Sequence, residues 1–208
     1  MRHRRKGRVL GRSPSHQRAL LRNLASALML TERVCEADEV GAPKVAGRII
    51  TTVAKAKEVR PLVERCVTIA KRGLISIDQA KEFGTTATRD SAAWKQWRES
   101  DQWRQWAQAM SPAVTARRRV VRLLGDKKAA RIVFERIAPR FVDRPGGYTR
   151  ILKLSTPRLG DAGPRAVLEF VGSGPKVDRG TAPQVQARRP NRPSSRPSSG
   201  SSRGAGAT

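Results

Sequence analysis

Apolar residues recur every three or four positions near the start of the chain and again in its middle, which is the period of an amphipathic helix. The first helix is expected to begin near Ser13, a favourable N-cap, with Pro14 at the first helical position. Its apolar positions are Leu20, Leu21, Leu24 and Leu28. The second helix is expected over 55–73, with Gly73 as its C-cap and Pro61 in an early turn or at a kink. Its apolar stripe consists of Val59, Leu62, Val63, Cys66, Val67 and Ala70.

Helical periodicity returns after residue 113. Residues 115–125 set valines and leucines beside four arginines. Asp126 is then placed to cap a further helix that runs to Phe141. One face of that helix is expected to be buried, with the members Ala130, Val133, Phe134 and Ile137.

Three short segments have the composition of β-strands. Residues 48–53 are rich in β-branched side chains, and 147–154 and 165–171 flank a loop of turn-forming residues, so the last two predict a hairpin. The expected fold class is therefore α+β. It is a compact body of several helices with a small sheet, made from the short strand and the C-terminal hairpin.

Both ends of the chain differ from this body in composition. Residues 1–12 carry six cations, and no acid precedes Glu32, so we expect a basic N-terminal arm that orders on RNA. Proline, glycine and serine make up 17 of the 36 residues of 173–208, which is typical of a disordered tail. That tail either binds RNA or is merely solvated. The body is then expected over 13–172.

All four tryptophans lie in one block, as two pairs with a repeat of nine residues: Trp94 with Trp97, and Trp103 with Trp106. Nine residues of unbroken helix would turn the pairs to opposite sides, so a break near Ser100 is needed for them to face each other. The favoured interpretation is a small cluster that clamps this segment to the body. The alternative is a platform on which exposed RNA bases stack.

Charge is the strongest compositional signal. The 208 residues include 43 lysines and arginines against 17 acids, a formal net charge of +26. A free monomer with this charge repels itself, so a polyanionic partner is expected, and nucleic acid is the first candidate because phosphate contacts release condensed counterions.

Motifs of catalysis, metal binding and membrane insertion are absent from the sequence. There is no phosphate-binding glycine loop, no nucleophile elbow and no zinc-protease helix. Cys35 and Cys66 are expected to be free thiols, because with His3 and His16 they do not form a zinc-ligand set. No run approaches the ~18 apolar residues of a membrane helix, and the N-terminus lacks the apolar part of a secretory signal. We expect no enzyme activity, no cofactor, no metal, no membrane partner and no small-molecule substrate.

Three blocks of the sequence carry a likeness to a known family. The opening block holds Met1, Arg2, His3, Arg4, Gly7, Ser15, His16, Arg22 and Asn23, and the second block is 51–71. The third block, 137–154, contains Pro139-Arg140-Phe141, Arg144, Gly146-Gly147-Tyr148-Thr149-Arg150 and Lys153, and is followed by Gly160-Asp161 and the last strand. With these blocks the chain resembles the bacterial large-subunit ribosomal proteins numbered seventeen, over 1–33, 48–73 and 116–172. Against that family, 34–47 and 76–112 read as insertions and 173–208 as a lineage-specific tail.

The resemblance implies a structural constituent of the large ribosomal subunit, embedded in its rRNA near the polypeptide exit side and located in the cytoplasm. Neighbouring ribosomal proteins would be further partners, and no catalytic role is implied. The expected RNA-binding residues are Arg2, His3, Arg4, Arg5, Lys6, Arg8, Arg12, His16, Arg18, Arg22, Arg140, Arg144, Tyr148, Arg150 and Lys153.

Three questions stay open at this point. Tyr148 either stacks on a base or simply covers the hairpin. A DNA-compacting architectural protein would have a similar charge and tail, but no DNA-reading element is recognisable. A mitochondrial member of the same family is a further alternative, although the basic arm speaks against a cleaved N-terminus.

Overall fold

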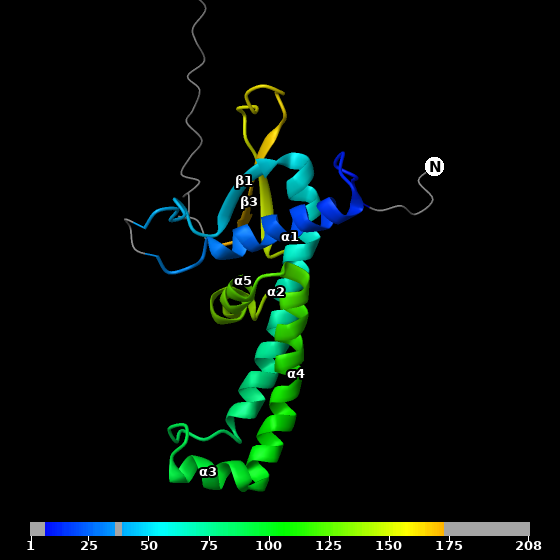
Figure 1. Cartoon of the computed structure of the whole chain (residues 1–208). Coiled ribbons are helices and arrows are strands. Elements are labelled where there is room, and N and C mark those ends of the chain that lie inside the picture. Colours follow the sequence, from blue (N-terminus) through cyan, green and yellow to red (C-terminus); the bar gives the residue numbers. More distant parts are fainter. Residues whose placement is uncertain (1–6, 36–38, 173–208) are drawn as a thin grey trace, which may run out of the picture. The chain divides into compact units, whose positions relative to one another are not determined.

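The computed structural model describes residues 7–35 and 39–172, so half of the predicted arm, 1–6, and the tail, 173–208, lie outside the described residues. In the described part, one strand follows the first helix and the other two strands come after all the remaining helices, and the three strands form one antiparallel sheet (Figure 1). The α+β prediction is therefore confirmed.

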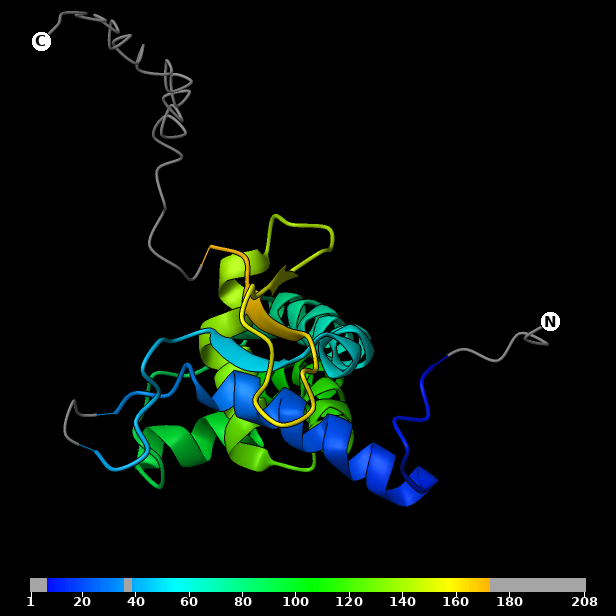
Figure 2. The ribbon, with the colours of Figure 1, turned by 90° about the horizontal axis from the view of Figure 1, so that it is seen from above.

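Helix α1, Pro14–Leu30, begins where the sequence predicts. Pro14 occupies its first turn, and Ser13 precedes it with an extended backbone but makes no capping hydrogen bond with its side chain. Its last turns bury Ala25, Leu28 and Met29, whereas its first turns are mostly exposed. In the two views, at right angles to each other, α1 lies crosswise to α2 (Figure 1 and Figure 2).

Helix α2, Val53–Lys81, follows strand β1, Arg48–Thr52, without a loop and is longer than predicted. The expectation that Gly73 ends the helix is wrong, because Gly73 is buried within it. A Cβ at this position would lie 2.9 Å from Cε1 of Phe134 and 3.1 Å from Cβ of Ala116. Close packing against two distant segments, and not a helix terminus, therefore accounts for this glycine. Pro61 lies in the third turn of α2. Its ring is exposed, and it has no N–H to donate to the helix.

Residues 76–112, which read as an insertion, are mostly helical. They complete α2 and build α3, Ala92–Glu99, and the first half of α4, Asp101–Leu124. Helix α4 returns alongside α2, and together they form a helical hairpin with α3 at the end away from the sheet (Figure 1). Ser100 separates α3 from α4 with an extended backbone, φ −77° and ψ 163°. The break that the tryptophan pairs need in order to face each other is thus present.

The segment after α4 winds irregularly. Gly125, in the left-handed region with φ 76°, ends α4, and the Asp126 carboxylate accepts a hydrogen bond of 2.7 Å from the Lys128 amide to cap α5, Lys127–Ile132. The chain then continues as a π-helical turn, Val133–Ile137, and a 3-10 turn, Ala138–Phe141. The predicted apolar face of this segment is buried, as expected for Ala130, Val133, Phe134 and Ile137.

The sheet places the last strand in its centre. Strand β3, Arg165–Phe170, pairs with β1 on one side and with β2, Thr149–Lys153, on the other, so the order is β1-β3-β2 and the predicted hairpin is confirmed. Ala166, Leu168 and Phe170 point from β3 into a core whose largest contribution comes from α2. The sheet and α1 therefore pack at one end of α2, and α4 covers its other half.

Candidate nucleic-acid interface

The outer face of α4 carries arginines that form no ion pair with an acid of the described residues. Thr115, Arg118, Arg119 and Arg122 have the spacing i, i+3, i+4 and i+7, which puts them on one side of the helix, and they line a shallow depression of about 370 Å³. All four are exposed. None of the ion pairs formed within 7–35 and 39–172 includes these arginines. Their guanidinium groups are therefore available to an external anion.

A groove between α2 and α4 adjoins this face. It has a volume of about 520 Å³, and Arg119 belongs to both surfaces. Arg72 lines the opposite side, and hydroxyl groups come from Ser76, Ser111 and Thr115. Guanidinium and hydroxyl donors together suit the oxygens of a phosphate backbone, which accept hydrogen bonds and carry negative charge.

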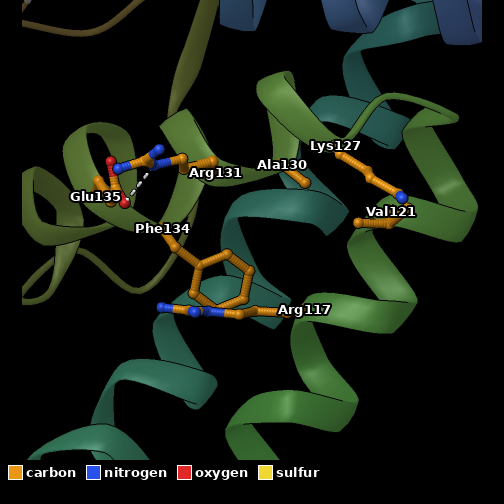
Figure 3. Close-up of a pocket in the computed structure, with 7 residues that line it drawn as sticks. All are labelled: Arg117, Val121, Lys127, Ala130, Arg131, Phe134 and Glu135. Atoms are coloured by element: carbon orange, nitrogen blue, oxygen red, sulfur yellow. Dashed lines mark hydrogen bonds and ion pairs between the residues drawn. The ribbon is translucent and has the colours of Figure 1, made fainter. Parts of the chain in front are cut away.

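A second pocket of about 380 Å³ extends the basic surface from α4 to α5. The Arg117 guanidinium carbon lies 5.4 Å from the centroid of the Phe134 ring, and Lys127 and Arg131 line the same pocket (Figure 3). Glu135 is the only acid among the lining residues, and its carboxylate accepts a hydrogen bond of 2.7 Å from Arg131 Nε. The pocket lining therefore keeps a positive balance.

The arginines of this surface were not among the residues predicted to bind RNA. In the sequence they stood out only as neighbours of the apolar residues of 115–125. The available signal was the absence of any acid between Asp101 and Asp126, combined with the helical spacing of Arg118, Arg119 and Arg122.

Of the predicted residues near the N-terminus, Arg12, His16, Arg18 and Arg22 are exposed along the start of α1. Arg8 is partly engaged within the protein, since its Nε lies 3.5 Å from Glu58 Oε1. The expected contacts at Arg2, His3, Arg4, Arg5 and Lys6 lie outside the described residues.

Arg140 and Arg144 have structural partners in addition to exposed surface. Arg140 Nη2 lies 2.8 Å from Glu32 Oε1, which ties the 3-10 turn to the end of α1. Arg144 Nε donates a hydrogen bond of 3.1 Å to the Gly146 carbonyl and thereby holds the turn before β2. Both side chains are exposed, so each is still accessible to a ligand while it holds the fold.

Glu169 of β3 organises two arginines across the sheet. The carboxylate is buried, with 2% of its side chain exposed, and it pairs with Arg150 of β2 and with Arg48 of β1, the latter at 3.4 Å. Strand register causes this arrangement, because both arginines lie directly opposite Glu169. One carboxylate faces two guanidinium groups, so the site keeps one excess positive charge. Lys153, at the end of β2, is exposed.

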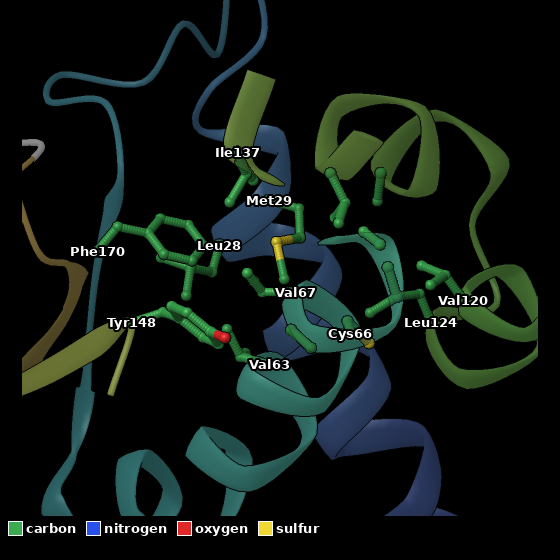
Figure 4. Packing of buried hydrophobic residues seen from close by; sticks show 14 of the residues in the cluster. Leu28, Met29, Val63, Cys66, Val67, Val120, Leu124, Ile137, Tyr148 and Phe170 are labelled. Carbon is green, nitrogen blue, oxygen red and sulfur yellow. The ribbon is translucent and has the colours of Figure 1, made fainter. Parts of the chain in front are cut away.

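Tyr148 is part of the core, with 1% of its surface exposed (Figure 4). Its ring packs against Phe141 at a centroid distance of 5.2 Å, and Lys71 Nζ lies 5.3 Å from the ring centroid and 3.4 Å from the hydroxyl oxygen. The buried ring has no free face for a nucleobase. Covering the hairpin is therefore the role that the structure supports, and base stacking by Tyr148 is not.

The two cysteines lie in no cluster of metal-binding side chains within the part of the chain that the structure describes. Cys35 and Cys66 are free thiols, and burial raises the pKa of Cys66 to about 12, which keeps it protonated at neutral pH. The described residues contain no group of three or more histidine, cysteine or acidic side chains that could hold a metal ion. Within the same part of the chain, no helix is both long and apolar enough to cross a bilayer.

Comparison with known proteins gives consistent results. A family model described as ribosomal protein L17 matches residues 20–171. A protein named large ribosomal subunit protein bL17 from Rhodopirellula baltica is 59% identical over 179 residues, which cover 86% of this chain and 85% of the relative. The proteins of the same name from Syntrophotalea carbinolica and Thermus thermophilus are 34% and 36% identical over 171 residues, or 82% of this chain and 75% and 99% of the relatives.

Proposed function

The chain belongs to the ribosomal protein L17 family, and on that premise we propose that it is a structural constituent of the large ribosomal subunit that binds and stabilises large-subunit rRNA by neutralising phosphates. A member of this family is a structural component of the ribosome and not an enzyme. Its surroundings would be the rRNA, neighbouring ribosomal proteins and, in a bacterium, the cytoplasm.

The observation that carries the RNA-binding part of the proposal is the acid-free face of α4. Arg118, Arg119 and Arg122 project from a rigid helix, and the helical rise separates Arg118 from Arg122 by about 6 Å along the axis. Cations fixed at such intervals can follow a phosphate backbone, and an arginine can grip each phosphate with two parallel hydrogen bonds.

The predicted residues of α1 and the arm extend this surface in the proposal. Arg12, Arg18 and Arg22 are exposed and reach the same kind of ligand, whereas Arg140 and Arg150 combine phosphate contact with an internal ion pair. Arg2, His3, Arg4, Arg5 and Lys6 enter the proposal from sequence alone. Base-specific readout is not part of it, because RNA duplexes expose phosphates and a shallow minor groove to a surface of this kind.

We also propose a division of the chain into three parts, based on the sequence. We take 1–12 as a basic arm, 13–172 as the body with additions at 34–47 and 76–112, and 173–208 as a basic tail. The DNA-compacting alternative is not favoured, because the relatives at 34–59% identity carry the name of a large ribosomal subunit protein.

A binding comparison tests the proposed function. The purified chain is titrated with large-subunit rRNA and with duplex DNA of random sequence at a fixed salt concentration near 200 mM. We expect the rRNA to bind at least tenfold more tightly, because only folded RNA matches the arrangement of the basic surfaces. Equal affinity for both would contradict a role specific to rRNA and would favour the DNA-compacting alternative.

A further inference from the structure

The end of the α2–α4 hairpin differs in charge from the rest of the protein. Residues 73–116 carry five basic and five acidic side chains, so 38 of the 43 bases and 12 of the 17 acids lie elsewhere, together with the whole net charge of +26. Several of the hairpin charges also neutralise each other locally. The N–O distances are 2.7 Å for Lys81 with Asp78, 3.9 Å for Arg89 with Asp90 and 3.1 Å for Arg104 with Asp101. A polyanion therefore gains little electrostatic attraction at this end.

Two of the four tryptophans hold the end of the hairpin together. Trp97 and Trp106 meet edge to face with centroids 5.6 Å apart, and Trp97 Nε1 donates a hydrogen bond of 3.0 Å to the Phe83 carbonyl. The ring contact fixes the short helix α3 on α4, and the hydrogen bond ties it to the turn after α2, which a helix of eight residues requires because it is unstable alone. Trp97 and Trp106 thus face each other across the break at Ser100. The favoured interpretation was that the tryptophans clamp the whole segment to the body. Instead, Trp97 and Trp106 join α3 to α4.

The other two tryptophans form a different structure. The Arg98 guanidinium lies between Trp94 and Trp103, 5.1 Å and 5.3 Å from their ring centroids. None of the residues of α3 is buried, and all four indoles remain partly exposed. The stack also contacts α4 through Trp103, but its rings stay partly exposed, and their contact with water costs free energy that a partner could recover.

We propose that this surface, which we call the tryptophan end (Trp94, Trp97, Arg98, Trp103 and Trp106), docks an uncharged, apolar or proline-bearing segment of a neighbouring protein of the large subunit. Tryptophan and arginine are the residues most enriched at the centres of protein interfaces, and charged residues are depleted there. The neutral balance fits such a partner and not the phosphates that accompany a stacked RNA base. The inference rests on the proposed function, since it places the chain in the subunit.

Site-specific photocrosslinking tests the proposal. A photoreactive amino acid is placed in turn at Gln96 and Gln102, both exposed beside the tryptophans, and the same label at Thr115 of the basic face serves as the matched comparison. Each labelled chain is first shown to co-sediment with the large subunit, and the subunits are then irradiated. Failure to co-sediment would count against the proposed function, whereas the adducts report on the tryptophan end alone.

We expect the labels at Gln96 and Gln102 to give one discrete protein adduct that resists ribonuclease, while the label at Thr115 gives an RNA adduct. In subunits that contain Trp94→Ala with Trp103→Ala, the protein adduct should fall about tenfold or more. The surface substitution Val114→Ala, outside the tryptophan end, should leave it unchanged. RNA adducts from Gln96 or Gln102 would overturn the proposal in favour of base stacking. No adduct from either position, with a normal adduct from Thr115, would overturn it in favour of a purely structural joint.

Discussion

Replacing Arg118, Arg119 and Arg122 by glutamine removes the three unpaired guanidinium groups from the outer face of α4 and leaves the helix intact. Glutamine has nearly the helix propensity of arginine, and none of the three side chains is buried, so the free energy of unfolding should change little. The expected consequence is confined to RNA binding and above all to its dependence on salt.

The magnitude follows from counterion release. Each phosphate contact contributes about 0.7–0.9 to the slope of log K against log salt, so three lost contacts should flatten the slope by about 2 to 2.7. Between 50 and 200 mM salt, the wild-type affinity should then fall about 20- to 40-fold more than that of the triple variant.

Fluorescence anisotropy with a labelled fragment of large-subunit rRNA measures both slopes. The control variant carries Lys81→Gln, Arg89→Gln and Arg104→Gln, which remove the same charge from side chains that already have acidic partners. Its slope should stay within about 0.7 of wild type, less than the value of one contact. Equal slopes for wild type and the Arg118, Arg119 and Arg122 variant would refute the assignment, and equal losses in the two variants would show a general charge effect without a defined surface.

Three further outcomes are expected. Alanine at three arm positions should flatten the salt slope by about 0.7–0.9 per lost contact, and an unchanged slope would remove the arm from the mechanism; the positions are Arg4, Arg5 and Lys6. Gly73→Val should lower the free energy of unfolding in urea by about 1–3 kcal/mol because its Cβ meets Phe134, whereas Gln79→Val on the exposed side of the same helix should cost far less. The Cys66 thiol should resist a thiol reagent at pH 8 until the protein unfolds, and Cys35 should react first. A reaction of Cys66 in the native state as fast as that of Cys35 would contradict its burial. Burial also raises the pKa of Cys66 from 9.0 to about 12, so the unfolded chain loses the thiol proton at a lower pH than the folded chain. The free energy of unfolding should therefore fall as the pH rises from about 9 towards 12.

Features with a local cause could be predicted from the sequence. The start of α1 follows from Pro14 in its first turn, and the hairpin follows from two strand-forming segments on either side of a turn-rich loop. Each of these signals lies within a few residues of the element that it specifies. Their outcome therefore does not depend on which distant segment packs against them.

Features decided by distant contacts could not be predicted. From the sequence alone, a glycine that ends a helix cannot be told from a glycine that leaves room for a neighbouring side chain. At Gly73 the second case applies, because the Phe134 ring packs against it. Likewise, Tyr148 beside a glycine turn could face solvent or core, and contacts with Lys71 and Phe141 place it in the core. Glu169 gave no signal in the sequence, because its arginine partners come from two other strands.

Sedimentation of a cell lysate through a sucrose gradient tests the central claim most directly, with the protein followed by mass spectrometry at moderate and at high salt. The account predicts the chain in the large-subunit peak at a stoichiometry of one, and predicts that it stays there at high salt. Recovery only at the top of the gradient, or with the nucleoid, would contradict it.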